Sequence, residues 1–463
     1  MTAFAHRVDK ADIMRAEARG SNVRYRKSQG LTPSEAILSD LCEKSFLNLW
    51  TYPNLYRKAG KELADLIVVF GNDILIFSDK SIAYPGTDDP ALNWSRWFRA
   101  AIKESAEQIW KAENCIRKNP TQIFLDAKAT QPLPLQLPAA ADLRFYGICV
   151  VSGVSERCIE LTERPSLALN LDVVDAGTAF TVGRITNQRN WVHVFDESTI
   201  SRLLAALSTT KDFVAYLDAK ERLLDGGLFT AADNELDILG YYLWHNREFP
   251  AQSQPFRLDP NLWDIVCMNS QFQRGMQKNR VSMFWDHLIE YLTNHYLDET
   301  LEFGNELAMS EWEILVRLMA SETRFYRRVL SEQIIQRIES VRAGEQHKIG
   351  TLLPSENPLV QYVMLVGPGS SEQDHAAYRE DRARELKLRC VAAKAAKPES
   401  RYFIGIALDG KKGGGSEDFV FIDTDGWDAQ VLAQARKLQA DLGYFMPGKM
   451  RETLTHVDEY PDA

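Results

Sequence analysis

The residues best suited to chemistry are an aspartate and a lysine at the end of an apolar β-hairpin. The segment DLIVVFGNDILIFSDKS begins at Asp65, and its two β-rich halves flank a Gly-Asn turn. A two-residue turn at this dipeptide pairs Asp65 with Ser78, and Lys80 then lies on the same face of the hairpin. Asp79 points to the opposite face. The spacing therefore predicts that a carboxylate, a hydroxyl and an ammonium group converge at one end of the hairpin.

Two interpretations of this convergence are open. Burying a carboxylate and an ammonium group beside so much valine and isoleucine is costly unless the charges pair or hold an ion. Asp65 and Lys80 could therefore form a structural ion pair at a strand edge, or they could belong to a cation-dependent site. The register of the hairpin is compatible with both.

The elements around the hairpin must position these residues. Residues 33–50 have the pattern of an amphipathic helix, and residues 94–118 form a long helix with one narrow apolar stripe. The segments 121–126 and 144–155 are predicted to be strands. This order of helix, hairpin, long helix and strands predicts an α/β or α+β unit.

The rest of the chain is predicted to add three further regions to this unit. FTVGRI and WVHVFDE look like another hairpin, a mostly helical stretch follows, and the last third returns to an α/β pattern. The predicted organisation is a basic N-terminal arm at 1–30, a core domain with its extension at 31–225, a mainly helical domain at 226–350, and a C-terminal α/β module at 351–463.

Charge and composition limit the class of protein. The chain has 463 residues and a formal net charge of −10, so a nucleic-acid site would have to be a local patch. The densest basic stretch is predicted to be a solvated arm that could contact phosphates, and its basic residues are Arg15, Arg19, Arg24, Arg26 and Lys27.

Cysteine usage and hydropathy bear on where the protein resides. The six cysteines are scattered without a CxxC pair, which indicates a reducing compartment rather than a disulfide framework. Neither a signal peptide nor an apolar run of the ~20 residues needed to span a membrane is visible. We therefore expect a cytoplasmic protein without a membrane segment.

The hairpin and its flanking helices resemble the PD-(D/E)XK nuclease superfamily, and more narrowly its nuclease-related-domain branch. The resemblance covers residues 35–155: a helix bearing Glu43, a strand bearing Asp65, a strand ending in Ser78-x-Lys80, and then a long helix. In that superfamily the Asp binds Mg²⁺ or Mn²⁺, and a Glu or Asp stands two residues before the Lys. This chain departs from the pattern because Ser78 occupies that second acidic position, which weakens a magnesium site.

Two other residues could supply the missing carboxylate. Asp79 could swing in through a β-bulge, which strand alternation disfavours. A carboxylate could instead come from the long helix, as in some restriction enzymes with S-x-K. Glu104 and Gln108 lie near the apolar stripe and thus near the sheet, whereas Glu107 lies opposite the stripe.

The resemblance implies a restriction-endonuclease-like core and a metal-dependent nuclease. The ion would be held by Asp65, the Asp79 main chain and Glu104, while Lys80 would orient water or offset charge in the transition state. Glu43 could support the metal shell through a water, although an exposed helix position explains it equally well. The resemblance implies that the partner is nucleic acid, with DNA as the first candidate. It also implies a role in bacterial defence or restriction.

Two rival interpretations remain at this point. In the first, Ser78 records a lost carboxylate, and the protein keeps the fold to bind nucleic acid or a protein partner without catalysis. In the second, the hairpin pair is only structural, and the helical and C-terminal regions dock a protein partner or a second copy of the chain.

Overall fold

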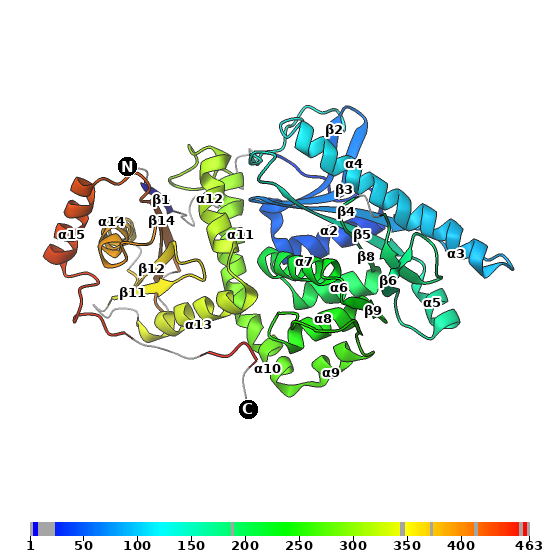
Figure 1. The fold of residues 1–463 in the computed structure, drawn as a ribbon. Coiled ribbons are helices and arrows are strands. Elements are labelled where there is room, and N and C mark those ends of the chain that lie inside the picture. The colour runs from blue at the N-terminus through cyan, green and yellow to red at the C-terminus, as the bar shows by residue number, and fades with distance from the viewer. Residues whose placement is uncertain are drawn as a thin grey trace. The chain divides into compact units, whose positions relative to one another are not determined.

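The computed structural model describes residues 3–7, 24–186, 189–342, 348–370, 374–411, 415–452 and 457–460. The chain divides into two compact units, whose elements are labelled in Figure 1. We call Tyr25–Met276 with Tyr460–Ala463 the N-terminal unit, and Met1–Arg24 with Gln277–Glu459 the C-terminal unit. The predicted helical stretch 226–350 is thus shared between the two units.

A five-stranded mixed sheet forms the centre of the N-terminal unit, in the order β2-β3-β4-β5-β8. An antiparallel meander contains β2 (Thr51–Lys58), β3 (Lys61–Phe70) and β4 (Asp73–Ser81). β5 (Arg144–Ser152) continues the sheet parallel to β4, and β8 (Val192–Asp196) is parallel to β5. The mixed helix and strand content confirms the predicted α+β class.

Helices cover both faces of this sheet (Figure 1). α2 (Pro33–Phe46) packs on the meander, and its first turn is capped by the Thr32 side chain. On the other face, α3 (Pro90–Phe98) continues through a π-helical turn, η2 (Arg99–Lys103), into α4 (Glu104–Lys118), which packs on β3, β4 and β5. The predicted apolar stripe is confirmed as buried, at Phe98, Ile102, Ser105, Ile109, Ala112 and Ile116.

Two strand predictions were wrong, and one strand was not predicted. The unpredicted strand is β2, where Pro53 has the pattern of a helix stop after residues 33–50, although a proline is tolerated in an edge strand. The segment 121–126 contains only isolated bridges at Phe124. The predicted second hairpin does not form, because β7 (Thr181–Arg184) pairs with β6 (Ala168–Val174) in another sheet while β8 joins the main sheet. Short apolar strands carry little information about their partners, which tertiary packing decides.

A smaller sheet in the order β10-β9-β6-β7 and several helices complete the N-terminal unit. Its remaining elements are η1 (Asn48–Trp50), α5 (Ser155–Thr162), α6 (Glu197–Ala206), α7 (Thr210–Asp225), β9 (Phe229–Ala232), α8 (Glu235–Trp244), β10 (Phe256–Arg257), α9 (Leu262–Met268) and α10 (Ser270–Lys278).

The C-terminal unit is built on a second five-stranded sheet, in the order β1-β14-β13-β12-β11. Its strands are β1 (Ala3–Arg7), β11 (Ile349–Pro354), β12 (Val360–Gly367), β13 (Tyr402–Asp409) and β14 (Glu417–Asp423). β12 and β13 are parallel and are joined by α14, whereas the other neighbours are antiparallel. Its helical elements are η3 (Asn279–Ser282), α11 (Met283–Leu297), α12 (Met309–Ala320), α13 (Arg324–Ser340), α14 (His375–Ala396) and α15 (Ala429–Leu442).

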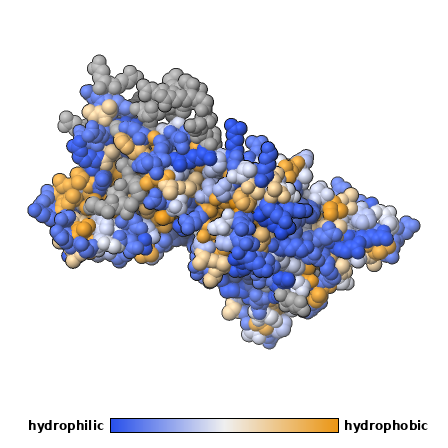
Figure 2. Space-filling model, turned by 90° about the horizontal axis from the view of Figure 1, so that it is seen from above, coloured by the Kyte–Doolittle hydropathy of each residue, from blue (hydrophilic) through white to orange (hydrophobic). Residues whose placement is uncertain are grey.

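The surface is mixed in character. On the face seen in Figure 2, hydrophilic residues predominate and hydrophobic ones are interspersed among them. Within the described ranges, no helix combines the length and the apolar character that a membrane crossing requires. The six cysteines are free thiols.

Candidate functional site

The hairpin adopts the predicted register. Phe70 pairs with Asp73, and the ladder continues as far as Leu66 and Phe77. Beyond the last ladder pair, the Ser78 hydroxyl donates to Oδ2 of Asp65 over 3.2 Å. The convergence of these side chains on one face of the hairpin is therefore confirmed.

The Asp65 carboxylate is the centre of the site. Lys80 Nζ lies 3.9 Å from its Oδ2, the distance expected for a loose ion pair. The Asp79 main-chain N–H donates to the same oxygen over 2.7 Å, and the Gln108 amide donates to Oδ1 over 3.2 Å. Asp65 is only 5% exposed, whereas the Lys80 side chain is 29% exposed. The site is thus buried at the carboxylate and opens to solvent at the lysine.

The α4 helix contributes two polar side chains to this centre. The Ser78 hydroxyl oxygen also lies 3.3 Å from the Ser105 hydroxyl and 3.4 Å from Oε1 of Gln108. Ser105 is fully buried within the apolar stripe and itself donates to the Ala101 carbonyl. These contacts fix the rotamers of both serines and orient the Gln108 amide toward Asp65.

Asp79 takes a different direction from its neighbours. Its side chain is hydrogen-bonded to Ser34 in the first turn of α2, on the face opposite α4. β4 pairs with β5 without interruption from Asp73 to Ser81, so a bulge that would turn the Asp79 carboxylate toward Asp65 is not formed. The predicted orientation of Asp79 is confirmed, and its carboxylate does not replace the missing acid at Ser78.

Two glutamates on the α2 face extend the site. Asn54, buried in β2 with a φ of 49°, lies just before the register of the strand shifts between Leu55 and Tyr56. It donates through its amide to Glu35 over 2.9 Å and to Glu62 over 2.8 Å. The Asn54 side chain therefore links the start of α2 to β3. We call Glu35, Glu62, Asp65 and Asp79 the carboxylate group.

The charges of the carboxylate group and of Lys80 shift the pKa values of Asp79 and Glu62. Burial raises the pKa of Asp79, and the negative charges of Asp65 and Glu35 raise it further. Burial also raises the pKa of Glu62, to which Asp65 and Glu35 add. Lys80 acts in the opposite direction on both pKa values. The four carboxylates thus lie on both faces of the hairpin end within electrostatic range of one another, and Lys80 offsets them only in part, an excess of negative charge that a proton or a cation can relieve.

Two residues predicted for the site lie outside it. Glu104, in the first turn of α4, is exposed to solvent, while Gln108 one turn later contacts Asp65. Glu43 is half-buried on α2, where burial and Asp40 raise its pKa and Lys27 lowers it. Lys27 itself donates to the Thr51 carbonyl over 2.7 Å, so this residue is packed against the unit rather than part of a solvated arm.

Glu35, Glu62 and Asn54 were not predicted as site residues. Glu35 had a visible local signal, because Thr32-x-x-Glu35 has the spacing of a capping box. Thr32 accepts from the Glu35 N–H, and Glu35 accepts from the N–H of Leu31, one residue before the cap. That signal marks a helix start and gives no hint of a second role. The contacts of Asn54 with both glutamates depend on the pairing of β2 with β3, which the sequence did not reveal.

The fold class defined by these elements is α+β, with a carboxylate-rich site at the end of a hairpin. The chain matches no protein-family model, and neither a curated protein nor a solved structure shows detectable similarity to it. Among the residues that the structure describes, no three His, Cys, Asp or Glu side chains are grouped closely enough to hold a metal ion between them.

Proposed function

We propose that the N-terminal unit is a metal-dependent nuclease that hydrolyses phosphodiester bonds in nucleic acid. The observation that carries the proposal is the charge imbalance at the hairpin end, where Asp65 and Lys80 lie 3.9 Å apart within a group of four carboxylates. The order of helix, three-stranded meander, long helix and parallel strand supports it, because the PD-(D/E)XK resemblance implies such a core around an Asp and a Lys on adjacent strands.

The donor set fits a hard cation such as Mg²⁺ or Mn²⁺. Magnesium needs only one or two protein carboxylates, because water and substrate phosphates complete its shell. Asp65 would hold the ion directly, and Asp79 would offer its main-chain carbonyl. Glu35 and Glu62 add negative charge on the α2 face. When bound, the ion would supply Lewis acidity toward the scissile phosphate and acidify a coordinated water.

The chain's own residues have separable roles in this proposal. Gln108 holds Oδ1 of Asp65, while the Ser78 hydroxyl and the Asp79 N–H hold Oδ2, so the carboxylate is fixed before substrate binds. Lys80, at the open end of the site, would donate to the phosphate or to the attacking water and offset the charge of the transition state. By resemblance, we propose DNA as the first substrate to test, and restriction or defence in the cytoplasm as the setting.

A second function has an observation in its favour. Ser78 stands where a second carboxylate would help hold the ion, and both oxygens of Asp65 already accept hydrogen bonds from the protein. This arrangement suits a nuclease fold without catalysis, which binds nucleic acid or a protein partner.

Cleavage assays separate the two functions. Wild type, Asp65→Ala and Lys80→Ala are incubated with single- and double-stranded DNA and RNA in Mg²⁺, Mn²⁺ or EDTA. We expect metal-dependent cleavage by wild type and its loss in both variants, because Asp65 would hold the ion and Lys80 would serve the phosphate. Lys44→Ala, which removes an exposed lysine paired with Asp40 on α2, is the matched control and should cleave normally.

The opposite result favours the non-catalytic function. In that case wild type cleaves none of the substrates with either metal, whereas it retains a nucleic acid or a protein partner in a binding assay. Unchanged cleavage by Asp65→Ala would also contradict the proposed nuclease site.

A further inference from the structure

One cavity of the N-terminal unit is not used by the proposed nuclease. It has a volume of about 370 Å³ and lies between α7, β9, β10 and the loop that follows α8. This volume lies within the range of small-molecule sites. Its lining residues are Ala219, Arg222, Leu223, Gly226, Leu228, Phe229, Arg247, Glu248, Phe249, Pro250, Ala251, Gln252 and Phe256.

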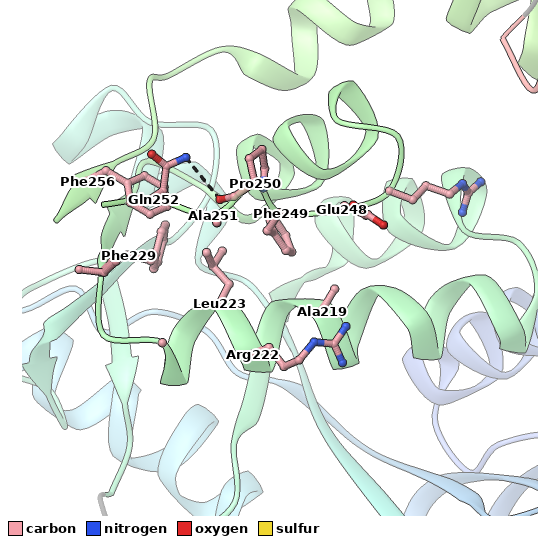
Figure 3. A pocket seen from close by; sticks show the side chains of 13 residues that line it. Ala219, Arg222, Leu223, Phe229, Glu248, Phe249, Pro250, Ala251, Gln252 and Phe256 are labelled. Carbon is pink, nitrogen blue, oxygen red and sulfur yellow. Dashed lines mark hydrogen bonds between the residues drawn. The ribbon is translucent and has the colours of Figure 1, made fainter. Parts of the chain in front are cut away.

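One end of the cavity is aromatic. Phe229 and Phe256 lie at this end, and their rings are 5.8 Å apart at an interplanar angle of 73° (Figure 3). Phe249 projects over Leu223 from the loop and packs on Tyr242, with ring centroids 5.4 Å apart. Phe229 and Phe256 are thus in edge-to-face contact, and a planar ring in the cavity can stack on a ring face that borders it.

A polar group accompanies the aromatic end. The Gln252 side chain lies beside Phe256 in Figure 3, where the dashed line joins its Nε2 to the Pro250 carbonyl, 3.4 Å away. The same nitrogen donates to the Tyr241 hydroxyl over 3.1 Å. This hydrogen bond holds the amide in place, and Oε1 is an acceptor for an N–H group at the edge of a heteroaromatic ring. A side-chain amide that can both donate and accept is well suited to the edge of a nucleobase.

Arginines occupy the other end of the cavity. The Arg222 guanidinium extends from α7 beneath Ala219 and Glu248 (Figure 3). Within the described part of the chain, no carboxylate lies at ion-pair distance from Arg222, so its guanidinium is available to an anionic ligand. Arg247 Nη1 is 3.0 Å from Oδ1 of the buried Asp212, which fixes the second arginine at the rim.

The loop that closes the cavity is held in an unusual backbone conformation. Asn246 and Arg247 both have positive φ values, of 54° and 65°, and the Arg247 N–H bonds to the Tyr242 carbonyl. The Asn246 conformation and this bond are those of a Schellman helix end. Arg247 is the second residue in succession with a positive φ, a conformation that is uncommon for arginine and costs free energy. This turn carries Glu248 and Phe249 over α7.

We propose that this cavity binds a nucleotide: a planar base at the aromatic end beside Gln252, and a phosphate at Arg222. The ligand chemistry combines a stacking ring with an anion, and it matches the division of the cavity into an aromatic and a basic end. A free mononucleotide and the terminal nucleotide of a strand share this chemistry. The site is separate from the carboxylate group and does not depend on the nuclease activity.

Calorimetric titration tests the proposal in EDTA, so that no divalent ion contributes. Wild type is titrated with AMP, GMP, CMP and UMP, with the four matching nucleosides, and with a 5′-phosphorylated trinucleotide. We expect at least one nucleotide to bind about tenfold or more tightly than its nucleoside, because only the nucleotide has a phosphate for Arg222. Tighter binding of the trinucleotide than of the mononucleotide identifies a strand end, and the reverse identifies a free nucleotide.

Variants of the two ends complete the test. Arg222→Ala should weaken nucleotide binding about tenfold and leave nucleoside binding unchanged, and Phe256→Leu should weaken both because it removes a flat ring. Arg257→Ala is the matched control, since Arg257 is exposed, follows Phe256 directly and is not part of the lining. The absence of nucleotide binding at millimolar concentration, equal affinity for nucleosides and nucleotides, or equal losses in Arg222→Ala and Arg257→Ala would each overturn the proposal.

Discussion

Asp65 in the N-terminal unit and Asp286 in the C-terminal unit are both almost wholly buried, yet their surroundings carry opposite excess charge. Asp286, on α11, accepts from Arg324 over 2.7 Å and from Arg327 over 2.6 Å. Asp65 shares one lysine with three other carboxylates. One carboxylate therefore has two buried cations, whereas the other competes for a single half-exposed one.

The difference indicates what each cluster is for. Arg327 also donates to the Ala320 and Glu322 carbonyls, so the Asp286 cluster ties α11, α12 and α13 together. Burial raises the pKa of Asp286, but the attraction of Arg327 and Arg324 outweighs it and the pKa lies below its usual value. Asp79 near Asp65 has a raised pKa instead. The first cluster is complete without a ligand, whereas the second has unmatched negative charge, to which we propose that a cation binds.

Asp286→Asn should have the largest effect on stability. Removal of this charge leaves two buried guanidinium groups unpaired, and we expect a loss of about 3–5 kcal/mol from the unfolding free energy of the C-terminal unit. Urea unfolding followed by hydrogen exchange of peptides from α11, α12 and α13 measures it.

Asp65→Asn is the matched substitution in the other cluster. This substitution removes one negative charge from a group with an excess of negative charge. We therefore expect the unfolding free energy of the N-terminal unit to change by no more than about 1 kcal/mol. Equal destabilisation of the two units by the two substitutions would contradict the comparison and identify Asp65 as a structural anchor.

A divalent cation should raise the unfolding free energy of the N-terminal unit by about 2–3 kcal/mol and leave that of the C-terminal unit unchanged. An ion that binds only the folded site stabilises it by about 2.7 kcal/mol at a hundredfold excess over its Kd. We expect Mn²⁺ or Mg²⁺ to slow hydrogen exchange in β3 and β4 of wild type and to have no such effect in Asp65→Asn. Protection of both proteins to the same extent would place the ion elsewhere.

Local rules predicted part of this site, and tertiary pairing determined the rest. The register of Asp65 and Ser78 followed from a two-residue turn and strand alternation, and the burial of Ser105 followed from helical periodicity. Glu35 and Glu62 are linked by Asn54, whose place beside them depends on which strand β2 pairs with. The sequence alone did not show that pairing, so these two glutamates could not be predicted as site residues.

The same limit applies to the parallel part of the sheet. β8 was assigned to a hairpin with the strand before it, although it pairs with β5, which precedes it by some forty residues in the printed sequence. A buried strand has the same apolar pattern beside any neighbour. The position of β8 in the sheet is decided by the helices and strands that lie between β5 and β8 in the chain. These elements leave no signature in the sequence of β8 itself.

The pH dependence of stability should be opposite in the two clusters. Because the folded pKa of Asp79 is raised, its ionised form is disfavoured in the fold, and wild type gains stability relative to Asp79→Asn as the pH falls through that raised pKa. The folded pKa of Asp286 is lowered, so its contribution is full above the ordinary aspartate pKa and is lost as the pH falls through the lowered one.

Unfolding of wild type and each variant in EDTA, between pH 2 and 8, measures these two differences. Each should amount to about 1.4 kcal/mol for every unit by which the pKa is shifted. The buried His193, whose pKa burial lowers, is common to wild type and Asp79→Asn, and its own titration cancels in their difference. Parallel rather than opposite pH profiles would show that the carboxylate group carries no excess charge.

The smallest expected effect concerns the helix that faces Asp65, and it separates Gln108 from Glu104. The Gln108 amide holds Oδ1 of Asp65, so Gln108→Ala frees that oxygen to rotate and should weaken Mn²⁺ binding several-fold, or by about 1 kcal/mol. Glu104 is exposed one turn earlier, and Glu104→Ala should behave like Glu107→Ala, which alters another exposed position of α4. Titration of all three variants with Mn²⁺ measures the difference. A loss of affinity in Glu104→Ala alone would mean that its carboxylate moves to the ion on binding, and would restore the helix glutamate as the missing acid of the Ser78-x-Lys80 site.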